Sequence, residues 1–188
     1  MIRDDLSNKL IHLTRGDSTD DPNKATEQAL ERFHSIVTQK KLLGGNGYIK
    51  GSYKCVCFTE APISKLSHIL ASGPSAGVRY SPFGVMVEKK WVYQKGGRPV
   101  IYGPDPDFAK LPDEMKYRHV RFWLGDEYEI DHTWEREWRI HTDELVLEPS
   151  QVTLVVPDRA VKEVFTQHVS PEWHFIVLSD LGVDVPSV

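Results

Sequence analysis

The order of its predicted helices and strands is the feature that most constrains how this 188-residue chain folds. Apolar residues recur at helical spacing early, from a start at Asp20 or Asp21 and Pro22 to about Gln39. Runs of β-forming residues dominate the middle and the end. Helices that precede a series of strands predict an α+β fold with a mainly antiparallel, split sheet and with helices mostly in the N-terminal half. No repeat or composition shift divides the chain, so we expect a single domain over 1–188.

The individual elements follow from local signals in the sequence. In the first strand, Ile11 and Leu13 are expected to face the core. The run Gly44-Gly45-Asn46-Gly47 is expected to end the first helix, because glycine suits a helix C-terminus better than it suits a phosphate loop that lacks the Lys-Ser/Thr motif. The predicted strands are residues 10–16, 53–59, 83–88, 98–102, 133–141, 152–156 and 174–178. Further helices are expected from Pro62 to about Ala71, over 158–167 and, as a candidate, over 116–124, with a linker at 72–77.

Composition and charge exclude several classes of protein. No apolar run reaches the roughly 18 to 20 residues of a membrane span, and the N-terminus lacks the basic and apolar blocks of a secretion signal, so we expect a cytoplasmic protein with no membrane partner. A net charge of −4 argues against a broad nucleic-acid-coating surface. A local basic groove stays open, from Lys89-Lys90, from the stretch Lys95 to Arg98 and from the stretch Lys116 to Arg121. Short basic runs of this kind are also typical of ordinary solvated faces.

The two cysteines do not indicate a metal site or a disulfide. Cys55 and Cys57 lie two apart in one predicted strand, where parallel side chains are hard to bridge. There is no second cysteine pair, and the eight histidines show no paired ligand spacing, so no metal is expected. A nucleophilic role for Cys57 lacks an identifiable base. Two small buried side chains are the better interpretation.

The string Trp134-Glu135-Arg136-Glu137-Trp138-Arg139-Ile140 is the candidate site with the most chemistry. Alternation in a strand would place Glu135, Glu137 and Arg139 on one face and the tryptophans on the other, packed so as to hold the carboxylate. An edge strand with exposed Glu and Arg is the competing interpretation. Three other segments combine polar groups with strand ends: His12-Leu13-Thr14, Phe58-Thr59-Glu60 and Tyr80-Ser81-Pro82-Phe83-Gly84.

These four motifs, in this order over about residues 10–142, resemble the ADP-ribosyltransferase superfamily, and within it the bacterial phage-defence and toxin branch of DarT-like, AbiGi-like and CmdT-like proteins. The Glu-Arg-Glu-Trp-Arg string is the distinctive part. The resemblance implies a split sheet with NAD, the co-substrate, in its cleft. This chain has Phe58-Thr59-Glu60 where better-known branches have Ser-Thr-Ser, so acceptor specificity does not transfer from them.

The resemblance also implies site roles, residue by residue. His12 would bond a ribose hydroxyl of NAD, and Leu13 and Thr14 would contact the nicotinamide amide. Tyr80, or secondly Phe83, would stack on the nicotinamide ring, and Thr59 would lie among the NAD contacts. Glu137 would bond the 2′-hydroxyl of the nicotinamide ribose, with Glu135 as its rival in the same motif.

Arg139 would steady Glu137 or meet an NAD phosphate, since a guanidinium binds either group in bidentate fashion. A second carboxylate, Glu60 or Glu135, is a candidate base toward the acceptor.

The expected function is therefore an NAD-dependent ADP-ribosyltransferase, a toxin or phage-defence effector. It would transfer ADP-ribose to a base in RNA or single-stranded DNA, release nicotinamide, and be held in check by an antitoxin or other neutralising protein. The alternatives are transfer to a protein target, a non-catalytic NAD-binding, nucleotide-binding or antitoxin module of the same fold, and a plain interaction domain.

Overall fold

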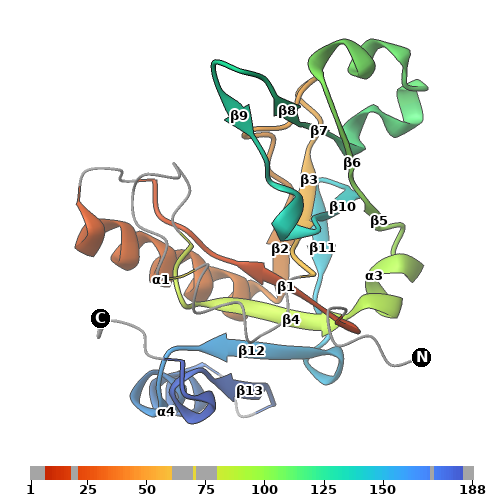
Figure 1. The fold of residues 1–188 in the computed structure, drawn as a ribbon. Coiled ribbons are helices and arrows are strands. Elements are labelled where there is room, and N and C mark those ends of the chain that lie inside the picture. Colours follow the sequence, from red (N-terminus) through yellow and green to blue (C-terminus); the bar gives the residue numbers. More distant parts are fainter. Residues whose placement is uncertain (1–6, 18–20, 61–69, 71–79, 170–171, 184–188) are drawn as a thin grey trace, which may run out of the picture. The chain divides into compact units, whose positions relative to one another are not determined.

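The computed structural model describes residues 7–17, 21–60, 70, 80–169 and 172–183, and it is a mixed α/β structure in which most strand pairs are antiparallel (Figure 1). Its contacts group the chain into two compact units. The first unit comprises Met1–Leu10, Leu42–Ala61 and Lys89–Leu145, and the second comprises Ile11–Lys41, Pro62–Glu88 and Val146–Val188. In the described part of the chain, no helix is long and apolar enough to cross a membrane.

A four-stranded sheet organises the second unit. Its strand order is β1 (Lys9–Leu13), β4 (Gly84–Glu88), β12 (Val152–Val156) and β13 (His174–Val177). Strand β12 is antiparallel to β4 and parallel to β13. Helix α4 (Arg159–His168), capped by Asp158, connects the two parallel strands, because a parallel pair needs a crossover.

Helix α1 (Pro22–Gln39) confirms the predicted bounds. The Asp21 carboxylate caps it by accepting hydrogen bonds from the backbone N–H groups of Asn23 and Lys24. The helix ends at Lys40, which is left-handed (φ 51°), and β2 (Lys41–Leu43) follows at once. The expectation that the glycine run ends the helix is therefore wrong: a lysine adopts the terminating conformation, and the glycines come after a strand.

Aromatic rings form the core of the second unit. Phe33 of α1 stacks on Phe83 at 5.8 Å between ring centroids and packs against Phe165 of α4 at 4.9 Å. Ile11 and Leu13 are buried, as predicted. At Gly84 a Cβ would lie 2.4 Å from the His12 carbonyl oxygen, so only glycine allows β4 to approach β1 this closely.

Strand β10 (Trp138–His141) is the centre of the first unit. It lies between β3 (Cys55–Phe58) and β5 (Arg98–Pro99) and is antiparallel to both. The other elements of the unit are α3 (Lys89–Gln94), β6 (Ile101–Gly103), η2 (Asp105–Lys110), η3 (Asp113–Arg118), β7 (His119–Arg121), β8 (Trp123–Leu124), β9 (Glu129–Ile130) and η4 (Thr133–Glu135). Strand β11 (Glu144–Val146) pairs with β2, and the short helices η5 (Pro149–Gln151) and η6 (Ser179–Leu181) complete the chain.

Two predicted elements of the first unit are wrong. Residues 133–141 do not form one strand, because η4 and a left-handed Arg136 (φ 46°) precede β10. Residues 116–124 are not a helix: η3 ends at Arg118, and Val120 of β7 pairs with Tyr102 of β6 in a parallel ladder. The helix expected after Pro62 and the linker at 72–77 lie outside the described residues.

Candidate functional site

The site is built on one face of the β3–β10 pair. Arg139 lies opposite Cys57, and His141 lies opposite Cys55. Side chains of directly opposed residues project to the same face of a sheet, and alternate residues share that face. Arg139 and both cysteines therefore line one surface, beside Glu137 immediately before β10.

Arg139 is anchored by its whole guanidinium. Its Nε and Nη2 donate to the two carboxylate oxygens of Glu137 at 2.7 and 3.1 Å, a bidentate pair. Its Nη1 donates to the backbone carbonyls of Tyr117 and His119 at 2.8 and 3.1 Å. Burial works to lower the pKa of Arg139, but the adjacent charge of Glu137 and the hydrogen bonds to it hold that pKa above its ordinary value. The side chain is 5% exposed, so Arg139 acts on Glu137 rather than on solvent.

Glu137 is held from several sides while its carboxylate keeps some exposure. The side chain is 13% exposed. Its backbone N–H donates to the Tyr102 hydroxyl at 3.2 Å, and its backbone carbonyl accepts from Val100 N–H at 3.0 Å. A carboxylate offers about four acceptor positions. The two hydrogen bonds from Arg139 use two of them, which leaves capacity for a further donor.

The two thiols on this face are poor nucleophiles. Burial raises the pKa of Cys57 well above its ordinary value, and the neighbouring charge of Glu137 raises it further. Burial likewise raises the pKa of Cys55 to about 11. A thiol reacts as its thiolate, so both cysteines are inert near neutral pH. Both are unbridged, as the sequence predicted.

A second buried carboxylate occupies the other face of β10. Glu60, with 8% of its side chain exposed, accepts a hydrogen bond from Lys89 Nζ at 2.7 Å and one from Trp138 Nε1 at 2.9 Å. These contacts engage both of its oxygens. Trp138 is thus fixed by Glu60, on the side of the strand away from Arg139.

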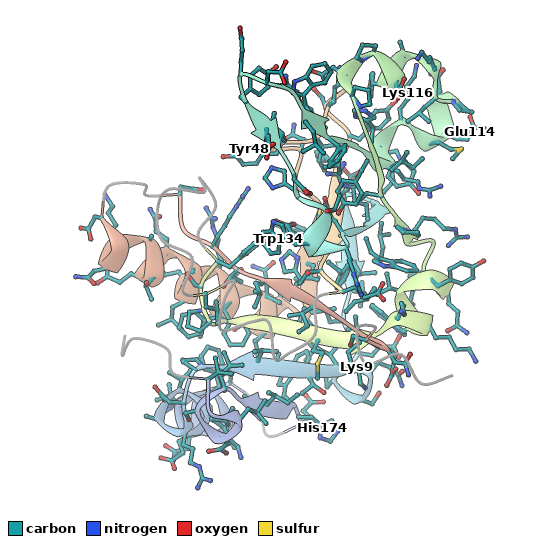
Figure 2. The ribbon with its side chains drawn as sticks, viewed as in Figure 1. Lys9, Tyr48, Glu114, Lys116, Trp134 and His174 are labelled. Atoms are coloured by element: carbon teal, nitrogen blue, oxygen red, sulfur yellow. The ribbon has the colours of Figure 1, made fainter. Side chains whose placement is uncertain are left out.

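Glu135 and Trp134 are not where a continuous strand would put them. Glu135 ends η4, and its backbone carbonyl accepts hydrogen bonds from Thr59 Oγ1 at 2.7 Å and from Glu60 N–H at 3.2 Å. Figure 2 shows Trp134 on the helical turn ahead of β10, where it is 49% exposed. The prediction that both tryptophans pack behind the carboxylate is therefore wrong for Trp134, because the left-handed Arg136 ends the alternation before it reaches that residue.

The remaining predicted residues lie in the second unit. His12 is half-buried on β1, followed by buried Leu13 and Thr14. Thr14 donates from its backbone N–H and from its hydroxyl to the Phe83 carbonyl, at 2.8 and 3.0 Å. The Phe83 ring is fully buried against Phe33, which leaves half-buried Tyr80 as the better placed of the two stacking candidates.

The sequence did not predict which groups outside the Trp134–Ile140 string bind Glu137 and Arg139. Tyr102 is one of these, and burial raises its pKa to about 12, so its hydroxyl stays protonated. The Tyr117 and His119 carbonyls are the others, and no side-chain pattern announces a backbone acceptor. The sequence showed two cysteines in one predicted strand, but it did not show that Cys57 lies opposite Arg139.

Two further observations concern metal binding and the comparison with known proteins. Within the described ranges, no group of three or more His, Cys, Asp or Glu side chains is placed to hold a metal ion. No protein-family model, no curated protein and no solved structure matches the chain.

Proposed function

We propose that this protein is an NAD-dependent ADP-ribosyltransferase that acts as a toxin or phage-defence effector on a nucleic-acid acceptor, RNA or single-stranded DNA. The observation that carries the proposal is the Glu137 carboxylate, fixed in orientation by bidentate Arg139 and still able to accept one more hydrogen bond. A ribose hydroxyl is a donor of the kind that this position accepts.

The chemistry favours such a carboxylate. Breaking the nicotinamide–ribose bond of NAD develops positive charge on the ribose, and a preoriented carboxylate stabilises that charge mainly in the transition state. Arg139 holds the Glu137 carboxylate in one orientation, so little reorganisation is needed when the charge appears. Its contacts favour this steadying role over a phosphate contact, because its nitrogens already bind Glu137 and two backbone carbonyls.

The other roles in NAD binding are proposed from the resemblance, residue by residue. Half-buried His12 carries ring nitrogens that suit a ribose hydroxyl, next to Leu13 and Thr14 on the first strand. Tyr80 offers an aromatic ring for the nicotinamide, in line with the resemblance. Thr59, at the end of β3, binds the Glu135 carbonyl and so supports the turn before Glu137.

A second candidate is a non-catalytic module of the same kind, including an antitoxin. One observation favours it: Glu137 and Arg139 satisfy each other in a largely buried pair, which also describes a purely structural ion pair. The two candidates differ in turnover of NAD.

Release of nicotinamide from NAD, without added acceptor, is the test. Glu137→Gln should lower the rate by on the order of 10²–10³, the usual cost of losing one such group. Glu135→Gln should retain it. Glu60→Gln is the folding control, because it also neutralises a buried, ion-paired carboxylate on the same strand pair. It should lower the thermal midpoint as Glu137→Gln does and still turn over NAD.

The outcomes separate the candidates. NAD binding without release by the unsubstituted protein would favour the non-catalytic module, and no binding would overturn both. Equal loss of turnover in Glu60→Gln and Glu137→Gln would assign the effect to folding. Incubation of labelled NAD with RNA, single-stranded DNA and cell lysate then identifies the fraction that takes up label, which for a protein acceptor would be protein.

A further inference from the structure

The segment from Lys89 to Pro104 is a basic part of the first unit. It carries four cations, Lys89, Lys90, Lys95 and Arg98, and no acidic residue. Lys89 is bound to Glu60, but the ion pairs among the described residues do not include Lys90, Lys95 or Arg98. The whole chain has a net charge of −4, so this positive charge is local.

An exposed aromatic ring lies among these cations. Tyr93 of α3 is 54% exposed, and the Arg98 guanidinium covers one face of its ring at 4.1 Å from the centroid. Lys90 is three residues before Tyr93 on the same short helix, a spacing that makes them neighbours. Figure 1 shows α3 leading directly into β5, which carries Arg98.

Two further contacts extend this surface. Arg118 donates from Nε to the Pro99 carbonyl at 2.9 Å, which adds a second guanidinium beside β5. Arg98 also binds only backbone carbonyls, those of Tyr93 and Gly97, so neither guanidinium is neutralised by a carboxylate. The α3–β5 surface is defined here as Lys90, Tyr93, Lys95, Arg98 and Arg118.

The other basic residues of the unit are different. Lys50 and Arg121 pair with Asp105, and Lys116, labelled on η3 in Figure 2, pairs with Asp113. Each of these three side chains is therefore paired with a carboxylate of the protein. The α3–β5 surface combines cations that have no carboxylate partner among the described residues with an exposed ring.

The surface adjoins the candidate site. Arg98 and Pro99 pair with Arg139 and Trp138 across the β5–β10 ladder. The next residue, Val100, donates its N–H to the Glu137 carbonyl at 3.0 Å. A molecule bound along β5 is therefore brought next to Glu137.

We infer that the α3–β5 surface binds single-stranded nucleic acid, with a base stacked on the open face of Tyr93 and phosphates held by the surrounding lysines and arginines. Stacking platforms flanked by cations are how proteins bind single strands without reading sequence. An acidic protein would use the charges but not the ring. The inference deepens the proposed function, because it names the surface that would bind the nucleic-acid acceptor. Only this acceptor role rests on the proposed function; binding of single strands does not.

Binding of a fluorescein-labelled single-stranded RNA of about 12 nucleotides, followed by anisotropy without NAD, tests the inference. The logarithm of the affinity should fall with the logarithm of salt concentration with a slope of about −2, as expected for three phosphate contacts on a single strand. Tyr93→Ala should weaken binding by about 5- to 100-fold, and Tyr93→Phe, which keeps the ring, by less than about twofold. Lys90→Glu with Lys95→Glu should weaken it by about 10-fold or more.

The matched control reverses two exposed lysines of the second unit, Lys24→Glu with Lys162→Glu, which changes the net charge by the same amount. Equal weakening by both double variants would overturn the inference, as would a stronger preference for duplex. So would polyglutamate binding as tightly as RNA with no effect of Tyr93→Ala, which would indicate an acidic protein partner. Because NAD is absent, RNA binding with no nicotinamide release would leave this inference standing and overturn the proposed function, and the reverse result would do the opposite.

Discussion

Two carboxylates lie on opposite sides of strand β10, buried Glu60 and partly buried Glu137, and they are stabilised in different ways. Glu137 is paired with an arginine only two residues away, and that arginine is in turn held by the Tyr117 and His119 carbonyls. Glu60 is paired with Lys89 and Trp138, which are 29 and 78 residues away. A pair of residues close in the chain can be predicted from the sequence, whereas a pair far apart in the chain cannot.

The two pairs also differ in how much water reaches them. Arg139 is 5% exposed, whereas Lys89 is 25% exposed and ends in a flexible ammonium. A guanidinium in fixed bidentate contact orients a carboxylate better than an ammonium does. The Glu137 pair is thus the more rigid, which suits a group that must meet a ribose in one orientation.

Removing the cation from each pair gives the largest predicted difference. Arg139→Met leaves Glu137 buried and unpaired and two carbonyls without their donor, so the free energy of unfolding should fall by about 3–5 kcal/mol. Lys89→Met should cost less, about 1–2 kcal/mol, because Trp138 still donates to Glu60 and water reaches the position. Urea unfolding measures both.

The double variant Glu137→Met with Arg139→Met sharpens the same comparison. It removes both charges, so it should be more stable than Arg139→Met alone. Equal costs for Arg139→Met and Lys89→Met would show that the two sites are energetically alike.

Alkaline pH should lower the free energy of unfolding, because the thiols on the Glu137 side of β10 ionise. The folded pKa of Cys55 is raised from 9.0 to about 11, so its contribution is fully present below pH 9 and is lost as the pH rises through about 11. The loss should reach about 2–3 kcal/mol, from about 1.4 kcal/mol for each pKa unit. Unfolding midpoints between pH 7 and 10.5, with reductant present, measure the larger part of this loss, which is complete only above about pH 11.

Cys55→Ala is the control for this pH dependence. It should reduce the decline between pH 9 and 10.5 without abolishing it, because the pKa of Cys57 is raised as well and its ionisation adds to the loss. An unchanged decline would assign the alkaline loss to other groups. Tyr102, with a pKa raised from 10.0 to about 12, contributes only above pH 10.

The smallest expected effect concerns the turn that leads from the Glu60 side to the Glu137 side. Thr59→Val removes the hydroxyl that donates to the Glu135 carbonyl and should cost about 0.5–1.5 kcal/mol, because Glu60 N–H still satisfies that carbonyl. Thr166→Val, at an exposed hydroxyl on α4, should change stability by less than about 0.5 kcal/mol. Equal effects in urea unfolding would show that the Thr59 contact adds nothing to the turn.

Local signals predicted the parts of the fold that depend on them. Pro22 after an aspartate gave the start of α1, and the apolar runs at 152–156 and 174–177 gave β12 and β13. The missed elements are short: β2 pairs with the distant β11, whereas α3 and the β8–β9 hairpin are local but have only six and two residues per element. The strand over 133–141 failed because Thr59 and Glu60 fix the Glu135 carbonyl from another strand.

The sequence by itself predicted that Glu137 and Arg139 share a face, since residues two apart in an extended segment do so, and it left open whether Arg139 binds Glu137 or a phosphate. It also determined that Cys55 and Cys57 would stay unbridged. Only the tertiary structure decided which carbonyls anchor Arg139, that Glu60 binds Trp138 on the opposite face, and that β5, which carries Arg98, pairs with β10. Those contacts join residues far apart in the chain, and strand register and burial, which no local pattern encodes, select them.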